Sequence, residues 1–294
     1  MRLTAGTGWA LGGFDLSGVD AAGVDWLVTS DTEGVEDMPG TRGGVVDQEH
    51  ADGGRVEPTY LEALSIVLRV RINAPTPEAA DTALEQLKAA VPVRDLAPLV
   101  HTERGRSRHR LVKQEGKPTF KRVSEYIIDA AIQLVAPQPR LLDGDGTGPT
   151  FTAGPVALPK VVGGLRIKPG GLRIKPGGIR IRASVNSGQI RLDTEGTETP
   201  PVLLRINGPL PDFTITATLG DTIQVQRYVE PVPAGQYLDI DLDRRLVRIN
   251  GTVSRRNKLV GPWIVPAPGM VFKFDSSTHN DTASMQLFAS SAWR

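Results

Sequence analysis

Apolar and polar residues alternate regularly between residues 64 and 72. Neighbouring side chains of a strand point to opposite faces, so a period of two gathers the apolar ones on one side. The run therefore predicts a long β-strand with a core face and a wet face. The core face carries Leu64, Ile66, Leu68, Val70 and Ile72, and the wet face carries Ser65, Val67, Arg69 and Arg71.

A different period follows in residues 77–91, where apolar side chains recur at spacings of three and four. That spacing predicts an amphipathic helix, which we expect to lie on the sheet that contains the 64–72 strand. Thr76 is placed to cap the helix, Pro77 suits the first helical position, and Pro92 ends it. The predicted buried face consists of Ala80, Ala83, Leu84, Leu87 and Val91.

Short extended runs, separated by turn-forming residues, make up the next segment. Gly116 and Pro118 interrupt it in the way that a hairpin requires. The segment then closes on the sequence Ala136-Pro-Gln-Pro-Arg140. The expected strands contain Leu111-Val112, Thr119-Phe120 and residues 125–135.

A strand, a turn and a second strand are predicted near the C-terminal end of the sequence. Alternation over residues 237–243 directs apolar side chains to a core and aspartates to water. The apolar set is Leu238, Ile240 and Leu242, and the acidic set is Asp239, Asp241 and Asp243. Arg244 lies in the turn, and the elements that follow contain Asn250-Gly251, Trp263, Pro268-Gly269 and residues 291–294.

Composition indicates a globular, mainly β protein. A chain of 294 residues with 39% hydrophobic and 23% charged residues can hold two compact domains. Its 32 glycines and 23 prolines indicate frequent turns, which suits many short strands. Because one helix is also predicted, we expect the α+β class with a preponderance of strand.

Charge and cysteine content narrow the function only slightly. The net charge of +1 gives no overall reason to expect a nucleic-acid partner. The absence of cysteine excludes disulfides, thiolate metal sites and cysteine nucleophiles, and is compatible with a reducing cytoplasm. Residues 1–13 lack the apolar core of a signal peptide, and the sequence has no run of 18 apolar residues. We therefore expect a soluble protein without an export signal.

Motifs that carry chemistry are missing from the sequence. It has no nucleophile-elbow, phosphate-loop or zinc-protease motif, and its four histidines lack ligand spacing. Asp143 and Asp145 begin like a calcium loop, but Gly154 and Pro155 stand where the last acidic ligand belongs. The aspartates of 237–243 could face a cation, although a solvated strand face accounts for them. We predict no catalytic, cofactor-binding or metal site, while a carboxylate pair in a cleft stays open because its geometry is tertiary.

Four arginines within residues 104–110 form the strongest local charge signal. A solvated loop, a nucleic-acid patch and an electrostatic contact between copies are the three interpretations. A nucleic-acid patch would require nearby aromatic side chains or a wider basic surface. For a contact between copies, the natural partner is the acidic segment 31–37 of a neighbour, and charge complementarity would fix the register. The cluster consists of Arg104, Arg106, Arg108 and Arg110.

A tandem heptad occupies residues 163–182, with two copies of Gly-Gly-Leu-Arg-Ile-Lys-Pro and a degenerate third. Each unit is expected to form a short strand and a turn, and its prolines exclude a coiled coil. We place the heptads in a connector over residues 141–184. One interpretation is a replicated hairpin that packs on the second domain, and the other is a basic ladder that meets an acidic surface of a neighbouring subunit.

The order of these elements resembles the distal tail proteins of long-tailed bacteriophages, which are siphovirus-type minor tail proteins. The strand, helix and hairpin that lead to Ala136-Pro-Gln-Pro-Arg140 are similar to the N-terminal belt domain of that family. The aspartate-rich strand, Asn250-Gly251, Trp263, Pro268-Gly269 and Trp293 are similar to its C-terminal domain. The resemblance implies a belt domain at 1–140, a connector at 141–184 and a galectin-like antiparallel β-sandwich at 185–294.

The same resemblance implies a structural virion protein of the tail tip, assembled in the host cytoplasm, and not an enzyme. Its copies would form a hexameric ring that joins the tail tube protein to tail-tip hub or baseplate proteins. DNA would be only a cargo that passes through the channel, and no cofactor is implied. We expect the ring to close by pairing of the 64–72 strand with the sheet edge of a neighbour.

Two alternatives remain open. The first is a carbohydrate-binding module, in which Trp263 stacks on a glycan of the host surface. The second is a tail-associated hydrolase, which requires an acid pair in a cleft.

Overall fold

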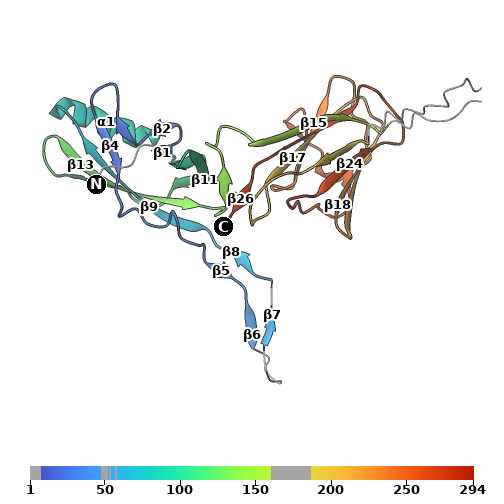
Figure 1. Ribbon diagram of the computed structural model, residues 1–294, viewed down its shortest axis with the longest axis horizontal. Helices are drawn as coiled ribbons and strands as arrows, with labels where there is room; N and C mark the ends of the chain where they lie inside the picture. The colour runs from blue at the N-terminus through green and yellow to red at the C-terminus, as the bar shows by residue number, and fades with distance from the viewer. Residues whose placement is uncertain (1–7, 48–51, 53, 57, 160–186) are drawn as a thin grey trace, which may run out of the picture. The chain divides into compact units, whose positions relative to one another are not determined.

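A computed structural model describes residues 8–47, 52, 54–56, 58–159 and 187–294 (Figure 1). The heptads at 163–182 lie outside the described residues. The chain divides into two compact units, of which the first contains Met1–Gly148 together with Ala292–Arg294 and the second contains Pro149–Ser291. Strands dominate both units, and the mainly β, α+β fold class is confirmed.

The first unit is built on an eleven-stranded antiparallel sheet with β9 (Leu64–Asn73) in its interior. β9 pairs along its whole length with β13 (Ile127–Ala136) and, on its other edge, with β4 (Asp25–Val28). The remaining strands are β1 (Gly8–Leu11), β2 (Phe14–Asp15), β3 (Gly18–Val19), β10 (Ala97–Glu103), β11 (Arg106–Gln114), β12 (Thr119–Arg122), β14 (Leu141–Asp143) and β26 (Ala292–Trp293).

The predicted alternation along β9 is confirmed, but its predicted pairing with the sheet of a neighbouring copy is not. All five core-face residues from Leu64 to Ile72 are buried. β13 occupies one edge of the strand along its whole length, and β4 with Glu33 occupies the other edge from Val67 to Asn73. A paired edge has no free N–H and C=O groups with which to add a strand from another chain. The expectation that β9 pairs with the sheet of a neighbouring copy is therefore wrong.

The predicted helix is present as α1 (Pro77–Ala90), which ends one residue before the predicted Val91. Leu84 of the predicted buried face is only partly buried. Ala80, Ala83 and Leu87 are buried, and they belong to the same core as the buried face of β9. The Thr76 hydroxyl accepts a hydrogen bond from the Ala79 amide at 3.1 Å, which satisfies one of the unpaired donors of the first turn. The helix thus closes one face of the sheet.

Two short ribbons leave the large sheet between β4 and β9. β5 (Thr41–Arg42) pairs with β8 (Tyr60–Leu61), and β6 (Val45–Asp47) pairs with β7 (Gly54–Val56). Figure 1 shows these two ribbons leading away from β9, and we call their described residues (41–47, 52, 54–56 and 58–61) the arm. None of its described side chains is buried. A two-stranded ribbon without a core is marginally stable alone, and the described side chains of the arm supply no such core.

The second unit is an antiparallel β-sandwich, as expected. Its six-stranded sheet has the order β15-β25-β17-β20-β21-β22, and its five-stranded sheet has the order β16-β24-β18-β19-β23. The strands of the first sheet are β15 (Phe151–Ala157), β17 (Val202–Asn207), β20 (Tyr237–Asp241), β21 (Leu246–Ile249), β22 (Val253–Ser254) and β25 (Ser284–Ala289). Those of the second are β16 (Gln189–Arg191), β18 (Phe213–Leu219), β19 (Thr222–Tyr228), β23 (Leu259–Val260) and β24 (Val271–Asp275), with a 3₁₀ turn at η1 (Arg256–Lys258).

The aspartates beside β20 serve the sandwich itself. Asp239 accepts two hydrogen bonds from Arg205, at 2.8 and 3.0 Å, across the pairing of β17 with β20. Asp241 accepts a bond from the Arg244 amide at 2.8 Å and so closes the turn to β21. Leu238 and Ile240 are fully buried on the opposite face. The predicted division of this strand into a core face and an acidic face is confirmed.

The unit boundaries differ from the predicted segments at two places. β15 lies within the predicted connector, yet it pairs with β25 as the edge strand of the sandwich. Ala292–Trp293 lies at the end of the predicted sandwich domain, yet as β26 it pairs with β14 in the first unit. Backbone pairing of such short or glycine-containing strands with distant partners has no periodic signal in the sequence.

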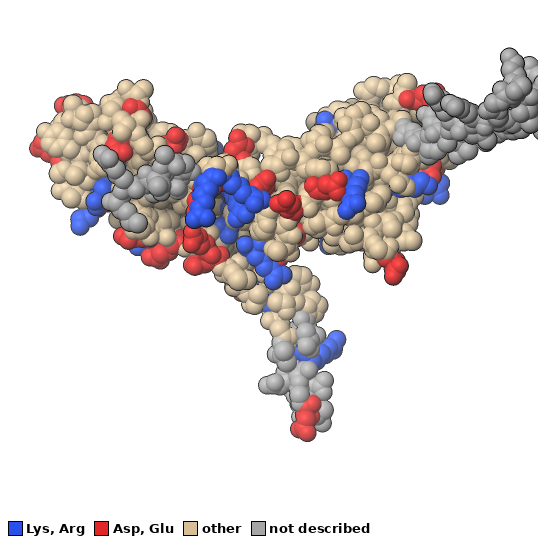
Figure 2. Space-filling model, viewed as in Figure 1, with Lys and Arg blue, Asp and Glu red and all other residues tan. Residues whose placement is uncertain are grey.

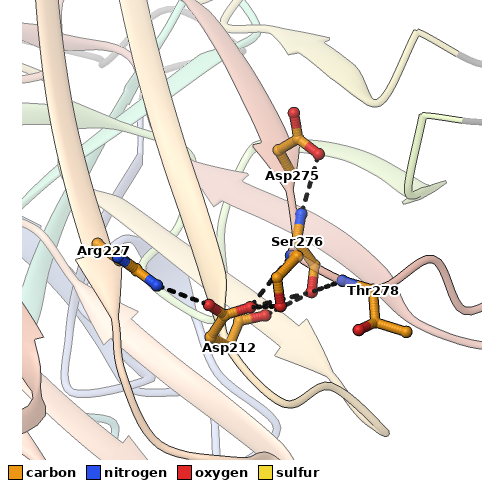
Figure 3. A network of polar contacts seen from close by, with 6 residues as sticks. Asp212, Arg227, Asp275, Ser276 and Thr278 are labelled. Atoms are coloured by element: carbon orange, nitrogen blue, oxygen red, sulfur yellow. Dashed lines mark hydrogen bonds and ion pairs between the residues drawn. The ribbon is translucent and has the colours of Figure 1, made fainter.

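One polar network ties three elements of the sandwich together (Figure 3). The Asp212 carboxylate, just before β18, accepts hydrogen bonds from the Ser277 amide at 3.1 Å and from Arg227 of β19 at 2.9 Å. Ser276, just after β24, donates to the backbone carbonyl of Asp212 at 2.6 Å. The bonds from Ser277, followed by the bond from Arg227, lower the pKa of Asp212 to about 2.

We expect Asp212→Asn to destabilise the sandwich by about 1–2 kcal/mol at pH 7. The pKa is lower in the folded than in the unfolded chain, so the carboxylate stabilises the fold above its ordinary pKa of 3.8 and loses this effect as the pH falls towards 2. The difference between wild type and variant in unfolding midpoint should therefore be large at pH 7 and small at pH 2. Asp221→Asn, at an exposed turn, is the control. A difference that does not depend on pH would contradict the prediction.

For the helix, we expect Thr76→Ala to lower the free energy of unfolding of the first unit by about 1 kcal/mol, because the Ala79 amide loses its cap. Thr82→Ala is the matched control: its hydroxyl bonds the Glu78 carbonyl within the helix, where alanine is the better helix former. Urea unfolding measures both. Equal destabilisation by the two substitutions would show that the cap contributes nothing.

Candidate functional site

Three of the four clustered arginines lie on a strand, and only Arg104 lies in the turn between β10 and β11. Arg106, Arg108 and Arg110 alternate along β11, so their side chains leave the same face of the sheet. The interpretation of this cluster as a solvated loop is therefore wrong for these three residues. Arg104 alone is almost wholly exposed, with 92% of its side chain accessible.

The pairing of β10 with β11 sets the neighbours of these arginines. His101 stands opposite Arg108, and Glu103 stands opposite Arg106. On the other side of β10, Trp9 of β1 is paired with His101, and the two rings stack with centroids 4.1 Å apart. Imidazole, carboxylate and guanidinium groups thus form one continuous polar row.

Trp293 supplies an aromatic platform for two of the arginines. It reaches them from β26, which pairs with β14 beside β11. The guanidinium carbons of Arg106 and Arg108 lie 4.7 and 4.6 Å from the centroid of its ring. Such cation–π contacts restrain long side chains that would otherwise be mobile. No local sequence pattern connects Trp293 with the arginines, because their partnership arises only when the two distant strands pair.

Arg110 is buried and anchors a neighbouring loop. Its guanidinium donates to the Pro139 carbonyl at 3.0 Å and to the Val35 carbonyl. Burial without a nearby carboxylate lowers the pKa of Arg110 from its ordinary value. Since that value is about 12.5, the group still carries its charge at neutral pH.

The acidic segment 31–37 packs against the sheet of its own chain. Arg69 of β9 donates to the Asp31 carbonyl at 3.1 Å and pairs with Glu33 at 3.4 Å. The backbone of Glu33 also exchanges hydrogen bonds with Val67. This segment therefore has partners within the chain, which weakens the hypothesis that it docks on the arginines of a neighbouring copy.

The acidic segment, β10, β11 and β14 line an open cavity of about 580 Å³, which we call the arginine cavity. Its lining combines five arginines with two glutamates, so positive charge prevails. Figure 2 shows the corresponding concentration of basic side chains over this part of the first unit. The lining residues are Val35, Glu36, His101, Glu103, Arg104, Arg106, Arg108, Arg110, Leu141 and Arg294.

Neither histidine near the cavity adds charge at neutral pH. Burial lowers the pKa of His101 below its ordinary value of 6.5, and nearby Glu103 offsets this only in part. Burial also lowers the pKa of His109, whose Nδ1 lies 3.0 Å from the Gly144 carbonyl oxygen. The positive field of the cavity therefore comes from guanidinium groups alone.

Trp263, the residue proposed to stack on a sugar, is half-buried against the core of the sandwich. The guanidinium carbon of Arg256 lies 4.3 Å from the centroid of its ring. A sugar stacks on an open aromatic face, and Arg256 covers one face of this ring. The geometry at Trp263 thus offers no specific support for glycan binding.

Within the described part of the chain, no group of three or more histidine, aspartate or glutamate side chains is placed to hold a metal ion. The same residues include no helix with the length and apolar character needed to cross a membrane.

The sequence matches no family model and no curated protein. The fold, in contrast, has solved counterparts. The crystal structure of the SPP1 Dit (gp 19.1) protein, described as a hub of the adsorption apparatus in phages that infect Gram-positive bacteria, matches with a TM-score of 0.61 at 10% sequence identity. The match covers 98% of this chain and 99% of the SPP1 protein.

Chains from the baseplate of phage p2 in its activated conformation also match at 10% identity, with a TM-score of 0.47 for the strontium form and 0.48 for the calcium form. Each match covers 96% of this chain and 97% of the other. From the SPP1 comparison, the chain has the fold of a Dit protein over nearly its whole length, as the resemblance to distal tail proteins implied.

Proposed function

We propose that this chain is a structural protein of a bacteriophage tail tip, located in the virion and assembled in the host cytoplasm. The observation that carries the proposal is the match of both units, in order and nearly end to end, to the SPP1 Dit protein. Its copies form a ring of six, which joins the tail tube to the tip or baseplate proteins. The first unit is the ring-forming belt, and the channel lets DNA pass. The proposal assigns no catalytic activity to the chain.

The arm is the element that closes the ring in this proposal. β9 is paired along one whole edge and along most of the other, whereas the arm forms sheets of its own and has no buried side chain among its described residues. Docking on the next copy would give it the packing that it lacks within its own chain. A segment of one copy that binds a different surface of the next makes a heterologous contact, the kind that closes into a ring.

Two large apolar side chains mark the docking face of the arm. Met38, just before the arm, is 68% exposed, and Tyr60 of β8 is 60% exposed. Aromatic and methionine side chains are enriched in protein–protein interfaces. The guanidinium of Arg42, 6.0 Å from the centre of the Tyr60 ring, adds a charged rim.

We expect the wild-type protein to form six-fold rings with a central hole, and Met38→Asp/Tyr60→Asp to remain monomeric. Both side chains are exposed in the single chain, so charges there leave the fold intact but cannot be buried between copies. Light scattering after size exclusion, with negative-stain images of the main peak, measures the outcome.

Val253→Asp is the control, since it places a charge on an exposed apolar residue of the sandwich. It should leave the rings unchanged. If Met38→Asp/Tyr60→Asp still forms rings, the arm does not close the ring. A wild-type chain that stays monomeric at every concentration would contradict self-assembly.

A further inference from the structure

Two arginines in the lining of the arginine cavity, Arg108 and Arg110, form no ion pair with a described carboxylate. Arg104 pairs with Glu103 at 3.5 Å, and Arg106 pairs with Asp143 at 3.3 Å. The Arg108 side chain forms no hydrogen bond or ion pair with any described residue, and its Nε is buried without a partner. Polar groups in such positions are normally satisfied, so an unmet guanidinium beside a cavity indicates that a partner is missing.

Arg110 increases this imbalance. Its two described hydrogen bonds go to backbone carbonyls, which solvate the guanidinium without cancelling its charge. A buried cation without a carboxylate is costly, and its field extends into the cavity because the surrounding protein screens it poorly. An anion in the cavity would offset the charges of both Arg108 and Arg110.

We propose that the arginine cavity binds an acidic segment of another protein, with carboxylates of that segment meeting Arg106 and Arg108. The binding goes beyond ring formation and does not depend on it, since the cavity lies within one chain.

The geometry favours an extended acidic segment. Alternate residues of a strand lie about 6.6 Å apart, so Arg106 and Arg108 leave the backbone of β11 at this repeat. Acidic residues at alternate positions of an extended peptide have the same repeat. A planar guanidinium can donate two parallel hydrogen bonds to one carboxylate, and Trp293 already restrains both arginines in place. Less side-chain entropy is then lost on binding.

A nucleic acid fits the cavity less well. Single strands bind by stacking bases on open aromatic faces, but Arg106 and Arg108 lie on the Trp293 ring and His101 is stacked on Trp9. The aromatic rings beside the cavity are thus already covered, which favours carboxylates of a protein segment over stacked bases.

The test uses the full-length protein and a fluorescein-labelled peptide in which glutamate alternates with serine. We expect saturable binding by fluorescence anisotropy that weakens as salt rises from 50 to about 500 mM. Arg106→Gln/Arg108→Gln should lower the affinity at least about tenfold. The control Arg244→Gln/Arg248→Gln removes two exposed arginines of the sandwich and should leave the affinity within about twofold.

A second pair of substitutions separates binding from folding. Glu36→Gln/Glu103→Gln removes both glutamates from the lining and should tighten binding about threefold, an increase that a misfolded protein cannot give. Arg108→Lys keeps the charge but loses the two-pronged donor, and should weaken binding. The proposal is overturned if the glutamine version of the peptide binds equally well, if the glutamate substitutions do not tighten binding, or if a thymidine octanucleotide binds more tightly than the acidic peptide.

Discussion

The first unit depends on the ten-residue antiparallel pairing of β9 with β13. Both strands direct alternate side chains into one core, and the pairing buries them as a continuous apolar surface on which α1 lies. The other edge of β9 receives β4 and the backbone of Glu33, which places the acidic segment beside the arginines of β11. A slip of one residue in this register would turn every core residue of β9 to water.

The net charge of +1 does not reveal how the charged side chains of this protein are paired. Their pairing differs between the two units. In the sandwich, Asp239 meets Arg205 with two bonds, and Asp212 meets Arg227 and two serines. These charges are matched within the unit and hold strands and turns in place. In the first unit, Arg108 and Arg110 have no matching carboxylate among the described residues. The first unit therefore has two positive charges, on Arg108 and Arg110, that no described carboxylate pairs with.

Long periodic segments could be predicted from the sequence, and short strands could not. Five alternating apolar residues identify β9, and the three–four spacing with its cap identifies α1. β1 to β4 and the arm have two to four residues per strand, too few for a period to emerge. The arginines were visible as a charge cluster, but polar residues on both faces of β11 hide its strand character. Trp293 joins them only through tertiary pairing.

The return of the chain to β26 makes the sandwich an insertion within the first unit. Residues 149–291 leave the first unit after Gly148 and come back to it at Ala292, so two covalent links hold the sandwich. During synthesis, Arg106 and Arg108 have no aromatic platform until Trp293 has been made. A chain that stops within the sandwich can form β9, β13 and α1 but never completes the arginine cavity. The arginine cavity can therefore form only after the whole insertion and the residues that follow it have been translated.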